Sequence, residues 1–257
     1  MDSIKAIVLA GGKNSDEMRQ ATGVSNRALV ELAPDRTMLD FVMGALRQAK
    51  SIAEIYVVGD VPATPETTPV APGSSMLDNI LLGIAAAKPM PGQPVLVVTS
   101  DIPFITSAAV DDFVVRANAA PVDFGYPIIP MDAYNREFAG MKRTTLKLRE
   151  GRFTGGNMVL LSPDRLVKNK DLVMKAYAAR KDVLALGRML GWGLLVRIVL
   201  SQVAFPGLLT IAQLETGIGR LMGAGSVARA VITEFASIGT DVDKPDDVAY
   251  ARERLGK

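Results

Sequence analysis

The chain has 257 residues, of which 49% are hydrophobic and 22% are charged, and its formal net charge is +2. This composition excludes a disordered chain, and the length suffices for one large domain or two small ones with a full core. Because the sequence contains neither cysteine nor histidine, disulfides, zinc–thiolate sites, thiol nucleophiles and histidine-based triads are all excluded. Any chemistry must therefore use carboxylates, lysine, arginine, hydroxyls, backbone amides or a hard metal ion held by oxygen.

The weak positive charge and the aromatic content of 5% do not indicate nucleic-acid binding, which usually needs a basic stripe and stacking platforms. The segment Met1–Lys5 is also unlike a secretory signal, because the apolar run that it starts is short and leads directly into a glycine turn. We therefore expect a cytoplasmic protein with no nucleic-acid partner.

Apolar runs and segments of helical spacing alternate along the first half of the chain. Strands are predicted at Ile4–Ala10, Ile52–Val58, Pro94–Thr99 and Phe124–Ile129, and helices at Met38–Lys50, Met76–Ala87 and Thr106–Ala119. This alternation predicts a three-layer α/β fold, in which a mostly parallel sheet carries helices on both faces. Ligands of such folds bind outside the carboxyl ends of the strands.

The second half of the chain is less regular. Short strands are predicted at Thr145–Leu148 and Met158–Leu161, a late strand within Val227–Phe235, and a closing helix at Pro245–Leu255. Residues 163–223 are predicted to be mostly helical and apolar. Since no linker separates two independent units, we expect a single domain over residues 1–257 with a helical insertion at about 163–223.

The stretch Leu184–Leu214 is unusually apolar, and Ile198–Leu214 carries no charge at all. The uncharged run Ile198–Leu214 is shorter than the ~20 residues that a membrane-spanning helix needs, and a Pro-Gly pair interrupts it. Its apolar residues lie almost all round a helix, so we favour a buried core or an interface of a homo-oligomer. The alternative is a membrane-surface helix that carries Arg188, Trp192 and Arg197.

Two segments at predicted strand ends carry residues suited to phosphate chemistry. Leu9-Ala10-Gly11-Gly12-Lys13 follows the first strand, where glycines let backbone N–H groups approach an anion and Lys13 adds a positive charge. The alternative is an ordinary turn between a strand and a helix. Ser100-Asp101-Ile102-Pro103 follows the third strand, where Asp101 can bind Mg²⁺. The alternative is an aspartate that caps the next helix.

Two further segments lie in the second half. Gly155-Gly156-Asn157 precedes a predicted strand and allows close backbone approach to a substrate, or else forms a tight hairpin turn. Alternation along an extended segment points Asp241 and Asp243 the same way, so that they can share a metal ion. The alternative for these two carboxylates is capping of the last helix.

A run of basic residues precedes the glycine pair and consists of Lys142, Arg143, Lys147, Arg149 and Arg152. The simplest interpretation is a solvated basic face, since charged side chains are ordinary on exposed strands. The alternative is a binding site for an anionic acceptor, which the position beside Gly155-Gly156 favours.

The order of these segments is more specific than any one of them. Together they resemble nucleotidyltransferases of the Rossmann-like GT-A class, close to the MobA-like NTP transferase family. The resemblance covers most of the chain and rests on six segments: Leu9-Ala10-Gly11-Gly12, Asn26-Arg27-Ala28-Leu29-Val30-Glu31-Leu32, Asp78-Asn79 with Gly83, Ser100-Asp101-Ile102-Pro103, Thr154-Gly155-Gly156-Asn157, and Asp241-Val242-Asp243-Lys244-Pro245-Asp246-Asp247.

The resemblance implies a role for each matching position. The triphosphate would be bound by the loop and basic residues Leu9, Ala10, Gly11, Gly12, Lys13 and Arg27, and the nucleotide base by Gly73, Ser74 and Asn79. Ser100 and Asp101 would border the phosphates, with Mg²⁺ on Asp101 and on Asp243 or Asp241. Arg27 and Asp101 would be the catalytic residues. The acceptor would lie at Gly155, Gly156 and Asn157, beside Arg143 of the basic run.

The reaction that the resemblance implies is transfer of a nucleotidyl group from an NTP, with CTP or GTP favoured, to a phosphorylated small molecule, with release of pyrophosphate. Such a step needs positioning and charge neutralisation more than acid–base catalysis, so the absence of histidine is no obstacle. The family has lysine where this chain has Arg27, and it usually has an arginine soon after the glycines, near Asp16. These departures favour one alternative, a non-catalytic nucleotide-binding regulatory protein. A glycosyltransferase that uses a nucleotide sugar is the other, although its usual Asp-x-Asp is absent after the third strand.

Overall fold

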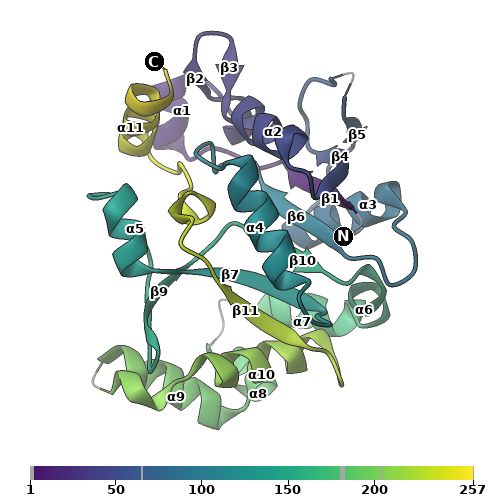
Figure 1. Cartoon of the computed structure of the whole chain (residues 1–257), viewed down its shortest axis with the longest axis vertical. Coiled ribbons are helices and arrows are strands. Elements are labelled where there is room, and N and C mark those ends of the chain that lie inside the picture. Colours follow the sequence, from purple (N-terminus) through teal and green to yellow (C-terminus); the bar gives the residue numbers. More distant parts are fainter. Residues whose placement is uncertain (1–2, 65, 180–182, 204, 257) are drawn as a thin grey trace.

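The fold is known from a computed structural model that describes residues 3–64, 66–179, 183–203 and 205–256 (Figure 1). Within these residues, nine strands form one sheet in the order β5-β4-β1-β6-β10-β7-β9-β8, with β11 paired to β7 beside this path. The strands are β1 (Ile4–Leu9), β4 (Ile52–Val58), β5 (Thr68–Val70), β6 (Val95–Thr99), β7 (Phe124–Pro130), β8 (Leu146–Leu148), β9 (Gly151–Gly155), β10 (Met158–Leu161) and β11 (Ala228–Ile232).

The sheet is mostly parallel, as the alternation of strands and helices predicted. Strand β1 lies between β4 and β6 and is parallel to both, while β10 is antiparallel to β6 and β7. Strands β9 and β10 thus run against the other members of the sheet. The continuous apolar sequences of β1 and β6 fit this position, because helices cover both faces of the central strands.

Alternation along β1 assigns its side chains to two separate cores. Ala6 and Val8 pack in a cluster with α2 (Met38–Gln48) and α4 (Ser107–Ala117). Ile7 points to the opposite face and packs in a cluster with α3 (Met76–Ala87), α6 (Pro163–Lys168) and the end of α10 (Ile211–Met222). The three-layer fold class predicted from the sequence is therefore confirmed.

A third cluster lies beyond the carboxyl ends of the central strands and draws on segments that are distant in sequence. It combines Met18 of α1 (Asp16–Thr22), Tyr134 of α5 (Met131–Glu137) and Val248 of α11 (Pro245–Leu255). The sequence patterns did not reveal α1, α5, β5, β9 or the small hairpin of β2 (Glu31–Ala33) and β3 (Arg36–Thr37). The described residues also include three short 3₁₀ turns: η1 (Arg27–Leu29), η2 (Pro206–Leu208) and η3 (Ala236–Gly239).

The region predicted to be a helical insertion is mostly helical. It contains α6, α7 (Lys170–Ala179), α8 (Val183–Leu190), α9 (Trp192–Val203) and α10, and Figure 1 shows α8, α9 and α10 below β7, β9 and β11, at the end of the molecule opposite α1 and α11. One half-buried side of α9, with Leu194 and Ile198, contributes to a small cluster around Leu148 and Phe153.

The expectation of a buried core is wrong for the other side of α9. Trp192, Val196, Val199 and Val203 are between 50% and 79% exposed, because α9 packs on one side only, against β8, η2 and its neighbouring helices. The alternatives of an oligomer interface and a membrane-surface helix stay open, and residue 204 of this stretch lies outside the described residues. No helix within the described residues combines the length and the apolar character needed to cross a membrane.

Candidate active site at the carboxyl ends of the strands

The glycine loop leaves β1 and is fastened by the segment that begins η1. The Asn26 Nδ2 group donates to the carbonyl oxygens of Ala10, at 2.9 Å, and Asp60, at 3.1 Å. The backbone N–H of Arg27 donates to the Gly12 oxygen at 2.8 Å. Gly11, Gly12 and Lys13 themselves are exposed at the surface. The loop is thus held at both ends while its middle stays open to a ligand.

The residues expected at the nucleotide base meet beside this loop. The side-chain oxygen of Asn79, on α3, accepts from the Gly73 N–H at 2.7 Å. A Cβ atom added at Gly11 would lie 3.2 Å from Asn79 Nδ2, so the loop packs closely against this side chain. Ser74 donates to Asp78, and together with a hydrogen bond from Ser75 this holds the pKa of Asp78 below its usual range. The sequence-predicted residues are therefore brought together, with the Ser74 hydroxyl occupied by Asp78.

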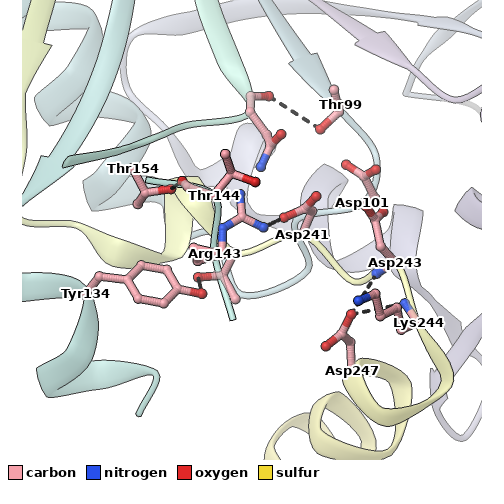
Figure 2. A network of polar contacts seen from close by, with 12 residues as sticks. Thr99, Asp101, Tyr134, Arg143, Thr144, Thr154, Asp241, Asp243, Lys244 and Asp247 are labelled. Carbon is pink, nitrogen blue, oxygen red and sulfur yellow. Dashed lines mark hydrogen bonds and ion pairs between the residues drawn. The ribbon is translucent and has the colours of Figure 1, made fainter. Parts of the chain in front are cut away.

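Arg27 joins the two carboxylates that the sequence predicted to bind a metal. Its Nη1 lies 3.0 Å from Asp101 Oδ2 and also contacts Asp243 Oδ1. The backbone explains this convergence, because the Val242 N–H donates to the Asp101 carbonyl oxygen at 2.9 Å. Asp247 accepts from the Asp243 N–H at 3.2 Å and so fixes the segment at the start of α11 (Figure 2).

Asp101 does not cap the following helix, which was the alternative to a metal-binding role. Helix α4 is capped by Thr106, whose hydroxyl accepts from the Ala109 N–H at 3.2 Å. The second carboxylate oxygen of Asp101 is buried and, within the described part of the chain, has no hydrogen-bond partner. The same holds for Arg27 Nε. Buried polar atoms without partners usually mean that a ligand, ion or water belongs there.

Asp241 pairs with Arg143 (Figure 2), whereas Arg27 contacts Asp101 and Asp243. The side chains of this pair are each 17% exposed. The expectation that Asp241 and Asp243 point the same way is therefore wrong. It assumed an extended strand, but residues 240–244 form an irregular segment between η3 and α11, where no ladder imposes alternation. Of the two alternatives for the second carboxylate, Asp243 is the one that contacts the Arg27 guanidinium together with Asp101.

The glycines of the predicted acceptor turn are required by packing. A Cβ atom at Gly155 would lie 2.3 Å from the Tyr126 hydroxyl oxygen, and one at Gly156 would lie 2.7 Å from Ile238 Cγ2. The turn is also fixed through its backbone, since the Thr99 N–H donates to the Asn157 oxygen at 3.0 Å. This bond places Asn157 beside the end of β6 and therefore near Asp101.

The basic run does not form one anion site. Lys147 and Arg149 donate to carbonyl oxygens of the helical insertion, those of Gln202 and Gly207. Arg152 donates to Thr145, and Lys142 is exposed. Of these five residues, Arg143 is the one that lines a cavity together with Gly155, Gly156 and Asn157, so the acceptor prediction reduces to this basic residue.

Two cavities meet at Arg143. The polar cavity, about 690 Å³ in volume, is lined by Lys142, Arg143, Asp241, Asp243, Lys244 and Asp247 among others. The apolar cavity, about 450 Å³, is lined at one end by Arg143, Gly155, Gly156 and Asn157 and elsewhere mainly by apolar side chains of β7, β8, β9 and α10. All four residues predicted to bind the acceptor therefore line the apolar cavity.

A glycine loop after β1, an aspartate after β6 and a carboxylate near the C-terminal helix meet at the carboxyl ends of the strands of an α/β sheet. The fold is that of a nucleotidyltransferase, and the chain belongs to the MobA-like NTP transferase domain family, whose sequence profile matches residues 6–181. Comparison with curated proteins gives no match.

Solved structures agree with this membership. A hypothetical transferase from Thermus thermophilus is 36% identical, with a TM-score of 0.79, over 96% of this chain and 99% of its own. Two more distant structures share the fold. A CMP:2-keto-3-deoxy-manno-octonic acid synthetase complexed with CTP has 14% identity and a TM-score of 0.61, over 99% of this chain and 98% of its own. The 2-C-methyl-D-erythritol 4-phosphate cytidylyltransferase of Francisella tularensis has 12% identity and a TM-score of 0.58, over 98% of this chain and 100% of its own.

Two positioning residues were not predicted from the sequence. Asn26 precedes Arg27 in a segment that carries the family resemblance, and its side chain both ties the glycine loop and caps η1. Asp247 lies in the first turn of the last helix, and this position could have predicted its capping role. The Arg143–Asp241 pair, in contrast, joins residues 98 positions apart, and no local pattern could have found it.

Proposed function

We propose that this nucleotidyltransferase transfers a nucleotidyl group from an NTP to a phosphorylated small-molecule acceptor and releases pyrophosphate. The observation that carries the proposal is the convergence of Asp101 and Asp243 on Arg27, directly beside the glycine loop. Two acidic groups and two basic groups, Arg27 and Lys13, at the open end of a phosphate-binding loop suit a polyphosphate and its counter-ion.

The donor set fits Mg²⁺. No three acidic side chains gather into a metal site within the described ranges, but Mg²⁺ commonly takes one or two carboxylates and completes its shell with substrate phosphates and water. Asp101 and Asp243 would hold the ion, and the unpartnered oxygen of Asp101 is free to do so. When bound, the metal would neutralise charge on the phosphates and orient them.

The residues of the chain supply the remaining functions. Backbone N–H groups of Gly11 and Gly12 bind the triphosphate, and Lys13 and Arg27 offset its charge as pyrophosphate leaves. Arg27 must give up part of its contact with the carboxylates to do so, since its Nη1 is shared between them. A phosphate oxygen of the acceptor, oriented by Arg143, attacks the α-phosphorus in line. Because a phosphate dianion carries no proton to remove, the step needs no general base.

The names of two structural neighbours guide the choice of substrates to test. One structural neighbour is named with CTP bound, and another is named for a cytidylyltransferase that acts on an erythritol phosphate. These names support testing CTP before GTP, and phosphate monoesters before other acceptors. They are compatible with the base contacts that we propose for Gly73, Ser74 and Asn79.

The experiment crosses four NTPs with a set of phosphate monoesters and measures pyrophosphate, with Mg²⁺ or with EDTA. We expect pyrophosphate to require NTP, acceptor and metal together. NTP binding without pyrophosphate for any acceptor would favour the regulatory alternative. A parallel incubation with nucleotide sugars tests the glycosyltransferase alternative, which would release a nucleoside diphosphate. Asp101→Asn serves as the control, because the substitution keeps the side-chain size and removes the charge.

A further inference from the structure

The apolar cavity contrasts with the charged site that it adjoins. It lies between one face of the strands β7, β8, β9 and β11 and the helix α10, and its lining includes, besides Arg143, two charged residues, Arg229 and Glu215, of which Glu215 accepts from the Ala230 N–H at 2.9 Å. Its larger apolar lining residues are Phe124, Ile128, Leu146, Phe153, Leu214 and Ile218. Its volume of about 450 Å³ is in the range of small-molecule sites. Since one water-sized group takes ~30 Å³ of liquid volume, the cavity holds on the order of 15 such groups.

Strand periodicity explains why apolar side chains surround an open space. Along β7, Phe124, Tyr126 and Ile128 face the cavity and are only half-buried, while Ile129 on the opposite face is fully buried in another cluster. Burial raises the pKa of the Tyr126 hydroxyl above its usual value. Large apolar side chains that are left partly open to water are unfavourable in free energy, and a ligand that covers them would recover part of that cost.

A second apolar space extends the first. A cavity of about 310 Å³ shares Phe124, Tyr126, Gly156 and Asn157 with it. Phe124 and Tyr126 therefore stand between two apolar spaces on the same side of the sheet. Their rings are stacked with centroids 6.2 Å apart, which makes an apolar wall that reaches towards the acceptor turn.

The end of the cavity at the acceptor turn has the opposite character. Arg143 Nε and Asn157 Nδ2 are both buried and, within the described residues, neither has a hydrogen-bond partner. Both residues line the cavity. Arg143 also pairs with Asp241 through its Nη1. Two buried N–H donors without acceptors call for ligand oxygen atoms, and a phosphate group supplies them with a charge opposite to that of Arg143.

From these observations we infer that the acceptor is an amphiphilic phosphate monoester, with its phosphate at Arg143 and Asn157 and an alkyl or prenyl chain in the apolar cavity. The inference rests on the proposed function and adds the chemical class of its acceptor. In the reaction, a phosphate oxygen of the acceptor forms a bond to the α-phosphorus of the NTP. The bond from the α-phosphorus to the bridging oxygen breaks, and pyrophosphate carries that electron pair away.

The first test measures binding without any nucleotide. Straight-chain alkyl monophosphates, from ethyl to octyl and below their micelle concentrations, are titrated into the protein by calorimetry. We expect the Kd to tighten about fourfold for each added methylene, the factor that ~0.8 kcal/mol of apolar burial gives, until the chain fills the cavity. A Kd that does not change with chain length would overturn the inference.

Matched variants locate the effect. Ala230 lines the cavity from β11, so Ala230→Leu removes chain space. This substitution should raise the Kd of octyl phosphate at least tenfold and change the Kd of ethyl phosphate by less than twofold. Ala212→Leu makes the same chemical change on the exposed side of α10 and should alter neither. If Ala230→Leu does not fold, Leu214→Ala replaces it and should move the best chain length upwards. Equal loss for short and long chains in Ala230→Leu would contradict the placement of the chain.

The same ligands are then offered with each NTP and Mg²⁺, and pyrophosphate is measured. Chain-length-dependent binding with pyrophosphate release supports both the acceptor class and the transfer. Chain-length-dependent binding without release for any NTP supports the apolar site and overturns the proposed reaction. Release with polar phosphate monoesters, together with no binding of octyl phosphate, supports the reaction and overturns the inference about the chain.

Discussion

Arg27 holds together two carboxylates that would otherwise repel each other, so its removal should change stability and metal binding in opposite directions. Its Nη1 contacts both Asp101 and Asp243. The substitution Arg27→Ala leaves two negative charges facing each other without a cation. We expect a less stable metal-free protein that binds Mg²⁺ more tightly, and that binds NTP more weakly because a charge-assisted contact to the triphosphate is lost.

The structure sets the size of the stability effect. Unit charges ~4 Å apart interact by about 4 kcal/mol at an effective dielectric constant of ~20. The side chain of Asp243 is 45% exposed while that of Asp101 is 18% exposed, so solvent screens the Arg27–Asp243 pair more than the Arg27–Asp101 pair. We therefore expect a net loss of about 1–3 kcal/mol in the free energy of unfolding. At ~3 °C per kcal/mol for a chain of this size, Tm should fall by roughly 3–9 °C.

Thermal melting with and without Mg²⁺ measures both effects in one experiment. At a Mg²⁺ concentration of ten times its Kd, metal binding adds about 1.4 kcal/mol to the free energy of unfolding, which raises Tm by ~4 °C. Arg27→Ala should show this rise at a lower Mg²⁺ concentration than the wild type. Arg27→Lys keeps the charge and is the matched control. The double variant with Asp101→Asn should regain part of the lost stability and lose the metal response.

Transfer activity gives an independent measure of the same residue. Loss of a charge-assisted contact worth roughly 1.5–3 kcal/mol should slow transfer by an order of magnitude or more in Arg27→Ala, with most activity kept in Arg27→Lys. An Ala variant with wild-type Tm, metal response and rate would refute this reasoning and would make Arg27 an ordinary surface residue.

Three further predictions concern separate parts of the molecule. Asp101→Asn should abolish Mg²⁺-dependent turnover with an intact fold, as judged by circular dichroism, and unchanged turnover would contradict its assignment as a metal ligand. Asp111 is partly desolvated, which opposes its ionisation, but hydrogen bonds from Ser51 outweigh this effect and hold its pKa below the usual value. The stabilisation from ionised Asp111 is therefore complete above the unfolded-state pKa of about 4 and is lost as pH falls through the lower native-state pKa. Asp111→Asn should lower the free energy of unfolding by about 1–3 kcal/mol at pH 7 and by progressively less as the pH is lowered. A pH-independent difference between the two free energies would argue against ionisation as the cause. On α9, Val199→Glu should keep Tm within a few degrees of the wild-type value, because Val199 is 52% exposed. Ile198→Glu should destabilise the protein, because Ile198 packs in the half-buried cluster around Leu148. If both variants unfolded, the buried-core prediction would be restored.

Local sequence patterns were sufficient for the sheet and its main helices. Continuous apolar runs such as Ile4–Leu9 and Val95–Thr99 fit a parallel strand that is covered on both faces, and helical spacing over Met38–Gln48 buries one side of α2. They failed for α9, because an apolar composition does not reveal whether a neighbouring element is present to cover it. The short elements α1, α5 and the β2–β3 hairpin depend on tertiary contacts and carried no strong periodicity.

For the site, the sequence by itself determined which chemistry was available and where the chain would present it. The absence of histidine and cysteine left carboxylates, basic residues and backbone amides, and strand ends located Gly11 and Asp101. The pairing of distant residues was decided only by the tertiary structure. The Val242–Asp101 backbone bond brings Asp243 to Arg27, and an irregular segment without a ladder turns Asp241 to Arg143. The physical reason is that such contacts arise when separate elements pack together, and a residue's local sequence carries no information about that partner.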